Sequence, residues 1–355
     1  MRVLIVDDSV VYRSQIRAAL EGEPLIEVVG VASNGKIALE MLEQKSVDVV
    51  TLDMEMPVLN GLETLKEIRA KNHNVKVIVF SSLTVRGSEA ALDALTHGAQ
   101  DFVTKPTGAE GSMSDAAAGI KRSLVPKILQ FLVNKESVAA PSRPAPVKDP
   151  IHQLPQQFLR KELATFHPSA VVIASSTGGP SAHEELFSAL HGELRCPIFI
   201  AQHMPPVFTA TFAKRIQQIS GIPCAEGIQG EVVQNKIYVA PGDYHMTLGQ
   251  VNGAITIQLD KKPQRNSVRP AADFLFESAA ALYRGKCMSV VLTGMGEDGL
   301  DGARAVKAQG GGVMIQSEAS CVVFGMPGAV WRAGLQDGVG ALPEIHVALA
   351  RMVLK

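Results

Sequence analysis

Along residues 1–130, short apolar runs alternate with stretches whose apolar residues recur at helical spacing, as in Lys36–Gln44 and Leu62–Ala70. The apolar runs predict buried β-strands at Val3–Val6, Val28–Val31, Val49–Leu52, Val77–Phe80 and Phe102–Val103. Strands without a polar face, alternating with helices, are typical of a parallel sheet covered on both sides. We therefore predict a doubly wound α/β domain over residues 1–130.

The composition changes after this region. Between Asn134 and Pro150, four prolines stand among alanine, serine, lysine and arginine: Pro141, Pro144, Pro146 and Pro150. Such a stretch cannot bury a core, and its prolines favour an extended, semi-rigid connector. We predict an interdomain linker over residues 131–168 and a second domain over residues 169–355.

The alternation of strands and helices returns in this second domain. Buried strands are predicted at Ala170–Ala174, Pro197–Ala201 and Ser289–Thr293, and a helix-like segment follows each. Three consecutive short strands, separated by the turns Pro241-Gly242-Asp243 and Asn252-Gly253, are predicted at Lys236–Ala240, Tyr244–Leu248 and Ala254–Leu259. The pattern indicates a second doubly wound α/β domain with an inserted antiparallel hairpin or meander.

Length and composition narrow the class of protein. A chain of 355 residues fits two domains, and 46% hydrophobic with 19% charged residues argues against disorder. Because the net charge is −1, nucleic acid and anionic lipid are not expected as partners. Reduced thiols are expected at Cys196, Cys224, Cys287 and Cys321. The N-terminal apolar run is too short for a signal peptide or a membrane span, so we expect a cytoplasmic protein without membrane insertion.

Acidic side chains follow two strands of the first domain. Asp7 and Asp8 come after the first strand and Asp53 after the third, so they should converge in the crevice at the carboxyl ends of the strands. Crowded carboxylates repel one another and are stabilised by a hard divalent cation such as Mg²⁺. Ser81 and Lys105 end the fourth and fifth strands. A hydroxyl, an ammonium group, a metal site and a reachable aspartate suit phosphoryl transfer to a carboxylate.

A serine, a histidine and a carboxylate follow strands of the second domain. Ser176 lies on a glycine-rich turn, where the N-terminus of a helix would offer backbone N–H groups to an oxyanion. His203 and Asp298 follow two further strands, so the three side chains can act as nucleophile, base and orienting carboxylate in acyl transfer. Alternatives stay open: the turn suits a phosphate equally well, His203 fits a satisfied rim histidine, and Asp298 fits a helix cap.

The first domain resembles the receiver domain of two-component response regulators. The matching residues are Asp7-Asp8, Asp53, Met56-Pro57, Asn60-Gly61, Ser81, Phe102 and Lys105-Pro106. The resemblance implies a flavodoxin-like fold in which Asp53 accepts a phosphoryl group that Lys105 contacts. It also implies a Mg²⁺ site made by Asp8, Asp53 and the main-chain carbonyl of Glu55, with Asp7 assisting through water. Ser81 and Phe102 would report the phosphate by shifting together, although Phe102 also fits an ordinary core position.

The second domain, and the order of receiver, linker and esterase, resemble the chemotaxis protein-glutamate methylesterase family, CheB. The matching motifs are Ser176-Thr177-Gly178-Gly179, Gln202-His203-Met204-Pro205-Pro206, Ala240-Pro241-Gly242-Asp243, Leu292-Thr293-Gly294-Met295-Gly296, Asp298-Gly299 and the run from Glu318 to Pro327. By this resemblance Ser176 is the nucleophile, His203 the base and Asp298 the orienting carboxylate. The backbone amides of Thr177 and Met295 would bind the oxyanion.

Two positions depart from the family pattern. Ala174 stands two residues before the nucleophile, where the family usually has glycine. Ser175 stands beside Ser176, which leaves a wrong choice of serine conceivable. His245 and Arg269 lie in segments similar to the family's and fit either a substrate groove or contacts that stabilise the fold.

The resemblance implies phosphorylation-activated hydrolysis of glutamate γ-methyl esters on methyl-accepting chemotaxis receptors, with release of methanol, and deamidation of specific receptor glutamines. A chemotaxis histidine kinase is the expected phosphodonor, no metal or cofactor is expected at the esterase site, and a monomer is expected. The unphosphorylated receiver is expected to hinder access to the esterase cleft. Three other classes are weighed: a regulator that only binds a receptor, a phosphate-binding α/β enzyme, and a DNA-binding regulator, which the lack of a basic recognition helix disfavours.

Overall fold

The computed structural model describes residues 1–71, 73–106, 113–136 and 165–355. The chain divides into two compact units, Met1–Ser142 and Arg143–Lys355. Most of the proline-rich segment predicted as a linker lies outside the described residues, whereas residues 131–136 form the end of a long helix. Each unit is described by itself below.

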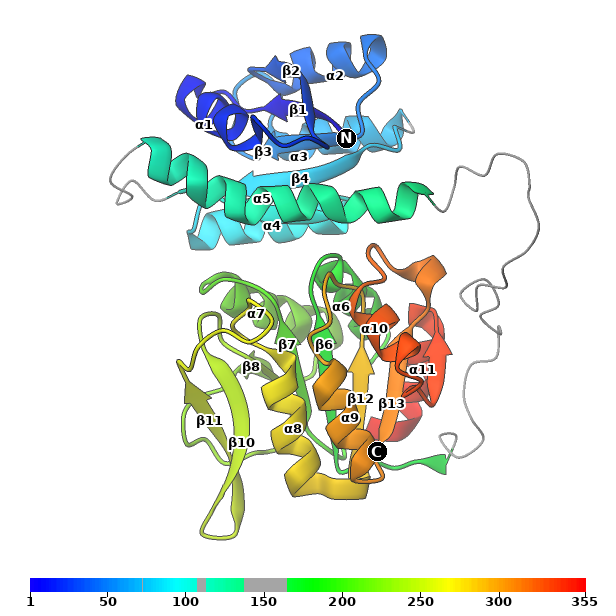
Figure 1. The fold of residues 1–355 in the computed structure, drawn as a ribbon. Helices are drawn as coiled ribbons and strands as arrows, with labels where there is room; N and C mark the ends of the chain where they lie inside the picture. Colours follow the sequence, from blue (N-terminus) through cyan, green and yellow to red (C-terminus); the bar gives the residue numbers. More distant parts are fainter. Residues whose placement is uncertain (72, 107–112, 137–164) are drawn as a thin grey trace, which may run out of the picture. The chain divides into compact units, whose positions relative to one another are not determined.

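The first unit contains a five-stranded parallel sheet in the order β2-β1-β3-β4-β5, as the alternating pattern predicted (Figure 1). Its strands are β1 (Arg2–Val6), β2 (Glu27–Ala32), β3 (Val49–Asp53), β4 (Lys76–Ser81) and β5 (Asp101–Thr104). Its helices are α1 (Val10–Leu20), α2 (Gly35–Gln44), α3 (Gly61–Ala70), α4 (Val85–Thr96) and α5 (Met113–Glu136). Helix α1 packs on α5, while α3 packs on α2 and on α4, so both faces of the sheet are covered.

The second unit contains a seven-stranded sheet in the order β14-β13-β12-β6-β7-β9-β8, in which every neighbouring pair is parallel. Its strands are β6 (Ala170–Ser175), β7 (Ile198–Gln202), β8 (Cys224–Glu226), β9 (Ile237–Val239), β12 (Cys287–Val291), β13 (Gly312–Gln316) and β14 (Gly338–Gly340). Its helices are α6 (Gly179–Ser188), α7 (Phe208–Ser220), α8 (Ala272–Tyr283), α9 (Leu300–Ala308), α10 (Met326–Arg332) and α11 (Leu342–Val353), with short 3₁₀ turns at Arg284–Lys286 and Glu318–Ser320. These sheets confirm the predicted fold class.

The antiparallel insertion is smaller than a three-stranded meander. Strands β10 (His245–Val251) and β11 (Ala254–Asp260) form a two-stranded hairpin, as the Asn252-Gly253 turn predicted. The segment predicted as its third strand instead contains β9, which pairs in parallel with β7 and β8. All of β9 is buried, because it carries apolar side chains on both faces and lies inside the main sheet.

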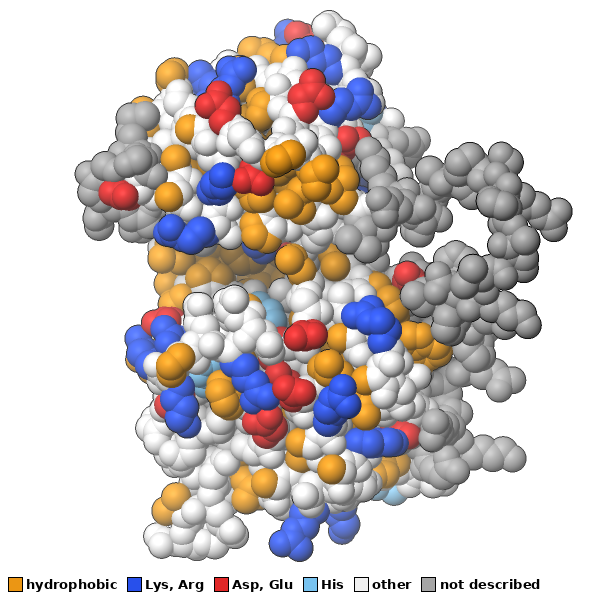
Figure 2. Space-filling model, in the orientation of Figure 1, with side chains coloured by type: hydrophobic (Ala, Val, Ile, Leu, Met, Phe, Trp, Pro, Cys, Tyr) orange, Lys and Arg blue, Asp and Glu red, His pale blue; other side chains and the backbone are white. Residues whose placement is uncertain are grey.

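One face of the large sheet and the hairpin share a single core. Side chains of β6, β7 and β12 pack there against α8 and α9, and the hairpin adds Met246, Leu248 and Ile257. Charged side chains of both signs are mixed over the outer surface of α8 and α9 (Figure 2), where Arg265 pairs with Glu277 and Asp301. Within the described residues, no helix has the length and hydropathy that crossing a membrane would need.

Candidate active site and acidic pocket

Three neighbouring strands bring the predicted serine, histidine and aspartate to one edge of the large sheet. The β6–β7 register pairs Ser175 with Gln202, so the next residues, Ser176 and His203, leave the sheet side by side. The amide of His203 donates to the carbonyl of Ser175 (3.1 Å), which fixes the two strand ends together. Strand β12 flanks β6 on its other side and leads into the loop that carries Asp298.

The two adjacent serines have different surroundings. Ser175 is fully buried, and its hydroxyl donates to Oε1 of Gln202 (2.6 Å) and accepts from Nε2 of His183 (2.8 Å). Burial lowers the pKa of His183 to about 3, so its ring is neutral and Nε2–H is the donor. Ser176 is only partly buried. The hydroxyl of Ser175 is therefore tied into the core, whereas Ser176 lies where a ligand can reach it.

The turn that carries Ser176 depends on close backbone packing. Gly178 has φ +77°, and a Cβ there would lie 2.6 Å from Val322 Cγ2. Helix α6 begins directly afterwards, so its positive N-terminal end lies at the turn. The amide of Ser176 donates to the Thr293 carbonyl (3.0 Å), and the Ser176 carbonyl accepts from Nε2 of Gln202 (3.0 Å). The turn is thus held from both sides by the strand ends next to it.

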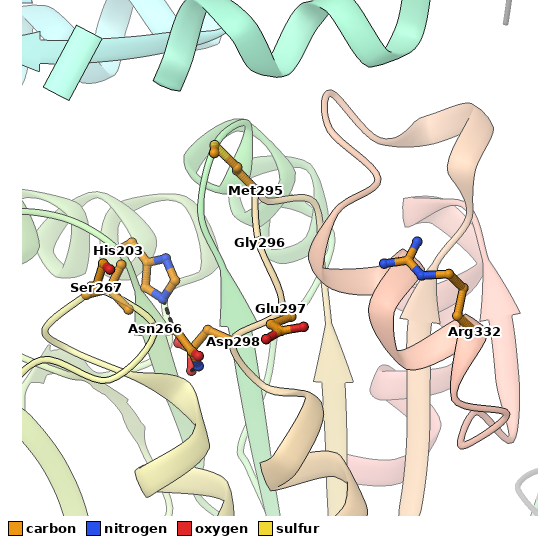
Figure 3. A pocket seen from close by; sticks show the side chains of 9 residues that line it. His203, Asn266, Ser267, Met295, Gly296, Glu297, Asp298 and Arg332 are labelled. Carbon is orange, nitrogen blue, oxygen red and sulfur yellow. Dashed lines mark hydrogen bonds and ion pairs between the residues drawn. The ribbon is translucent and has the colours of Figure 1, made fainter. Parts of the chain in front are cut away.

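His203 and Asp298 form a direct pair. Nε2 of His203 lies 2.7 Å from Oδ2 of Asp298, and Figure 3 shows the imidazole ring pointing at this carboxylate. The side chain of His203 is 10% exposed and that of Asp298 2%. Asp298 also accepts the amides of Ala272 (2.6 Å) and Asp273 (3.2 Å) at the start of α8. The carboxylate therefore caps α8 rather than the helix that follows it, α9.

A second buried carboxylate, Asp273, lies beside Asp298 and caps α9 in return. Its Oδ1 accepts the amides of Gly299 (3.0 Å) and Gly302 (2.8 Å). Burial, together with the charge of Asp298, raises the pKa of Asp273 to about 6. Burial alone would raise the pKa of Asp298 as well, but the hydrogen bond and charge of His203, with the two α8 amides, lower it. Asp298 is thus the carboxylate that stays ionised.

A pocket of about 480 Å³ opens beside this pair. It is lined by His203, Asn266, Ser267, Val268, Met295, Gly296, Glu297, Asp298 and Arg332 (Figure 3). Met295, 44% exposed, stands at the pocket, whereas Thr177 is buried in the turn after Ser176. His245 and Arg269 do not line it: the first contacts the carbonyl of Pro263 and the amide of Ala271, and the second pairs with Asp243.

The three aspartates predicted to converge in the first unit do so. Oxygen atoms of Asp7, Asp8 and Asp53 lie within 4.8 Å of one another. Nζ of Lys105 lies 2.8 Å from Asp53 Oδ1 and 3.3 Å from Asp7 Oδ2. Burial alone would lower the pKa of Lys105, but the hydrogen bonds and charges of Asp53 and Asp7 raise it, so the ammonium stays charged.

The donor set of this acidic pocket fits a Mg²⁺ ion. Asp7 and Asp53 are buried; in the described part of the chain Asp53 Oδ2 has no hydrogen-bond partner, and Asp7 Oδ2 faces the ammonium group of Lys105. Burial and the charge of Asp7 raise the pKa of Asp53 to about 6, although Lys105 acts against this. Carboxylate oxygens crowded together beside one ammonium group are the kind of ligands that a hard divalent ion prefers.

The remaining predicted residues of the acidic pocket lie around it. Ser81 is buried, and its hydroxyl donates to the carbonyl of Gly87 (2.6 Å). Phe102 is 7% exposed and lies under the ammonium group of Lys127. Glu55 is exposed, and its amide donates to Asp53 (3.2 Å). The amide of Lys105 donates to the Ser81 carbonyl (2.8 Å), which joins the ends of β4 and β5.

Comparison with known proteins agrees with this architecture. The model of the CheB methylesterase family matches residues 171–349, and that of the response regulator receiver domain matches residues 3–116. Over 360 residues the chain is 42% identical to a protein of Trichodesmium erythraeum named protein-glutamate methylesterase/protein-glutamine glutaminase, with 99% of each chain covered. A Caulobacter vibrioides protein of the same name, numbered 2, is 43% identical over 358 residues, covering 99% of this chain and 98% of that one.

The chain belongs to the CheB methylesterase family. Among solved structures, it is similar to the catalytic domain of the CheB methylesterase of Thermotoga maritima, with 42% identity and a TM-score of 0.50. That alignment covers 52% of this chain and 97% of the Thermotoga chain. The family predicted from the motifs is thereby confirmed, and so is the order of a receiver before a CheB catalytic domain.

Several residues of this CheB site were not singled out from the sequence. Asp273 looks like an ordinary acid in the first turn of a helix, and Asn266 like a polar loop residue. His183 was not singled out either, and Gln202 was quoted only as part of a motif, yet together they hold Ser175 from two different elements. The sequence did hold one signal that the two serines differ in their surroundings: side chains alternate along a strand, so Ser175 and Ser176 should point to opposite sides.

Proposed function

We propose that this chain hydrolyses γ-methyl esters of glutamate residues on methyl-accepting chemotaxis receptors, releasing methanol, and deamidates specific receptor glutamines. The observation that carries the proposal is the buried His203–Asp298 pair next to Ser176, at the mouth of a pocket, in a member of the CheB family. The names of the relatives, protein-glutamate methylesterase/protein-glutamine glutaminase, supply the substrate class.

The contact between His203 and Asp298 supports one path for the proton. Because Asp298 is ionised and only accepts, Nε2 of His203 carries the proton and Nδ1 has the free electron pair. In the proposed reaction Nδ1 takes the hydroxyl proton of Ser176 while Oγ attacks the ester carbonyl. The imidazolium then returns that proton to the leaving methoxide, which departs as methanol and leaves an acyl-serine.

A water molecule completes the cycle by the same route. Nδ1 of His203 removes a proton from the water as its oxygen attacks the acyl carbonyl, and Oγ of Ser176 leaves with that proton. Hydrolysis of a glutamine differs in the leaving group: the imidazolium must protonate the amide nitrogen of the tetrahedral intermediate before it departs as ammonia. Both reactions end in a glutamate side chain and the free enzyme.

The negative charge of each tetrahedral intermediate needs donors near Ser176. The amides of Thr177 and Met295 are proposed as these donors: the first lies next to the N-terminus of α6 and the second at the pocket. Preorganised N–H groups of this kind are worth on the order of 10²- to 10³-fold in rate. No metal is needed for this chemistry.

Phosphorylation of the receiver domain is proposed to control the esterase activity. Asp53 accepts the phosphoryl group from a chemotaxis histidine kinase, Lys105 contacts the phosphate, and Ser81 and Phe102 respond to it. For the hydroxyl of Ser81 to bind phosphate, it must leave the Gly87 carbonyl that it contacts now. Asp8, Asp53 and the Glu55 carbonyl, with Asp7 through water, would hold Mg²⁺, which offsets the charge of the phosphoryl oxygens when bound. The protein is proposed to act as a cytoplasmic monomer.

Methanol release from methylated receptor membranes tests both parts of the proposal. Wild-type protein is expected to release methanol, and a small phosphodonor with Mg²⁺ is expected to increase the rate. In Asp53→Asn the increase should disappear, because an amide cannot accept the phosphoryl group. The receiver assignment is wrong if this variant is stimulated as strongly as the wild type. Absence of release under every condition, from folded protein, contradicts the esterase itself.

Gly294→Ala is expected to lower methanol release on the order of 100-fold, because small displacements of reacting groups have effects of this size. A Cβ at this position would meet Sδ of Met326 and would lie 2.8 Å from the Cβ of Ser176 and 3.0 Å from its amide nitrogen, so the turn that carries the serine must move as well as the methionine. Gly253→Ala, on the β10–β11 turn, serves as control: its φ of +84° strains the substitution locally, but no heavy atom lies within 4 Å of the new Cβ, so methanol release should stay near the wild-type rate. Equal rates for both variants would contradict the proposed position of Ser176.

A further inference from the structure

The loop between β11 and α8 places one side chain on both buried carboxylates. Nδ2 of Asn266 donates to Asp273 Oδ2 (2.9 Å) and to Asp298 Oδ1 (3.2 Å). A primary amide nitrogen has two hydrogens, so one Asn266 side chain can serve both acceptors at once. Figure 3 shows Asn266 directly beside the His203–Asp298 pair.

Asn266 completes the set of donors that fix the orientation of Asp298. Oδ2 receives His203 and the amide of Ala272, and Oδ1 receives the amide of Asp273 and Asn266. The two amides belong to the first turn of α8 and cannot leave without breaking the helix end. Among the described residues, the side chains of His203 and Asn266 donate to Asp298, and Asn266 comes from a loop.

The same amide lies between two groups that repel each other. Asp273 and Asp298 are both buried, and the charge of Asp298 raises the pKa of Asp273. The groups that face the pair are His203 on Asp298, and Arg265, whose Nε lies 3.4 Å from Asp273 Oδ2. Without Asn266, the carboxylates would lose the donor that they share, and the ionised form of Asp298 would be less stable.

This loop is also a wall of the pocket. Asn266, Ser267 and Val268 line it, and the first two hold φ values of +53° and +63°. Consecutive non-glycine residues in the left-handed region are strained and persist only where the surroundings hold them. A substrate that fills the pocket would therefore press on the segment that carries the Asn266 amide.

We infer that Asn266 is a positioning residue for the hydrolysis: it holds Asp298 ionised and oriented toward His203, and it links the pocket wall to that pair. The inference rests on the proposed function, in which Asp298 orients the catalytic histidine. Asn266 does not touch the reacting atoms. Its effect is therefore expected on turnover and on its pH dependence more than on substrate binding.

Two substitutions separate this role from simple packing. Asn266→Gly keeps the left-handed backbone and removes the donor, so kcat for methanol release should fall on the order of 10- to 100-fold, the value of one hydrogen bond to a charged group. Asn266→Asp keeps the shape but adds a third carboxylate, and kcat should fall further. If Asn266 only fills space, Asn266→Asp would be the more active variant, which would overturn the inference.

The pH profile gives a second readout. Removing a donor from an ionised carboxylate raises its pKa, so the acid limb of kcat should move to higher pH in Asn266→Gly. The change in KM should be smaller than the change in kcat. Asn252→Gly makes the same substitution at φ +50° in the β10–β11 turn and should behave as wild type. An unchanged acid limb together with wild-type kcat in Asn266→Gly would overturn the inference.

The two proposals can fail separately. Ser176→Ala, measured in the same assay, tests the esterase: if it is inactive while both Asn266 variants equal wild type, only the role of Asn266 is wrong. The downfield proton resonance of His203 Nε2–H gives a readout that needs no turnover. It should persist in Ser176→Ala and shift or broaden in Asn266→Gly; the same position and width in both would count against the inference.

Discussion

Ser176→Ala is expected to reduce methanol release from methylated receptor membranes on the order of 10⁶-fold, the size of effect found when the nucleophile of a serine hydrolase is removed. Without Oγ no acyl-enzyme can form, whatever the state of His203 and Asp298. Ser176 is only partly buried, so removing its hydroxyl leaves the packing of the core unchanged. The melting temperature should therefore stay close to that of the wild type, which thermal unfolding can check.

Ser175→Ala is the matched control one residue away. It leaves Ser176 intact, so most of the turnover should remain. The substitution leaves Oε1 of Gln202 and Nε2 of His183 in the core without the hydroxyl that they contact now. This lowers the free energy of unfolding by about 1–3 kcal/mol. A loss of stability without a comparable loss of activity is thus expected from Ser175→Ala, and the opposite from Ser176→Ala. If Ser175→Ala were the inactive variant, the two serines would have been assigned the wrong way round.

The parts of the site that could be predicted from sequence follow from one rule of parallel sheets. Residues that follow parallel strands gather at the same edge, so Ser176, His203 and Asp298 could be placed together without knowing the order of the strands. The same rule placed Asp7, Asp8 and Asp53 in one pocket, where their oxygens do converge. In both units the motif residues lie directly at strand ends, where local sequence carries the information.

What could not be predicted depends on contacts between distant segments. The local sequence of β9 is that of a short strand between two turns, which fits one strand of a meander. Its pairing with β7 and β8 places it in the main sheet. The alternative role for Asp298 was to cap the helix that follows it. Its carboxylate instead caps α8, where it accepts the amide of Ala272, a residue 26 positions earlier in the chain. The bridge from Asn266 to two carboxylates has no sequence signature, because loop geometry creates it.

Asp298→Asn is expected to lower methanol release on the order of 10⁴-fold, because an amide in this place reverses the histidine tautomer. Two orientations of the new amide are available. If its oxygen faces His203 and Ala272, its NH₂ meets the amide of Asp273 and Nδ2 of Asn266, which are both obligate donors. If its NH₂ faces His203, it meets one obligate donor, the amide of Ala272, instead of two, and the ring can adapt by accepting at Nε2.

The second orientation is therefore favoured, and it moves the proton of His203 to Nδ1. A protonated Nδ1 cannot accept the proton of Ser176, so turnover stops at its first step. Asp301→Asn, three residues further along, is the control: its side chain is 59% exposed and pairs with Arg265 and Arg304 at the surface. Turnover should remain near the wild-type rate in Asp301→Asn. A rate in Asp298→Asn within tenfold of the wild type would mean that His203 keeps its tautomer without this carboxylate, and the proposed proton path would be wrong.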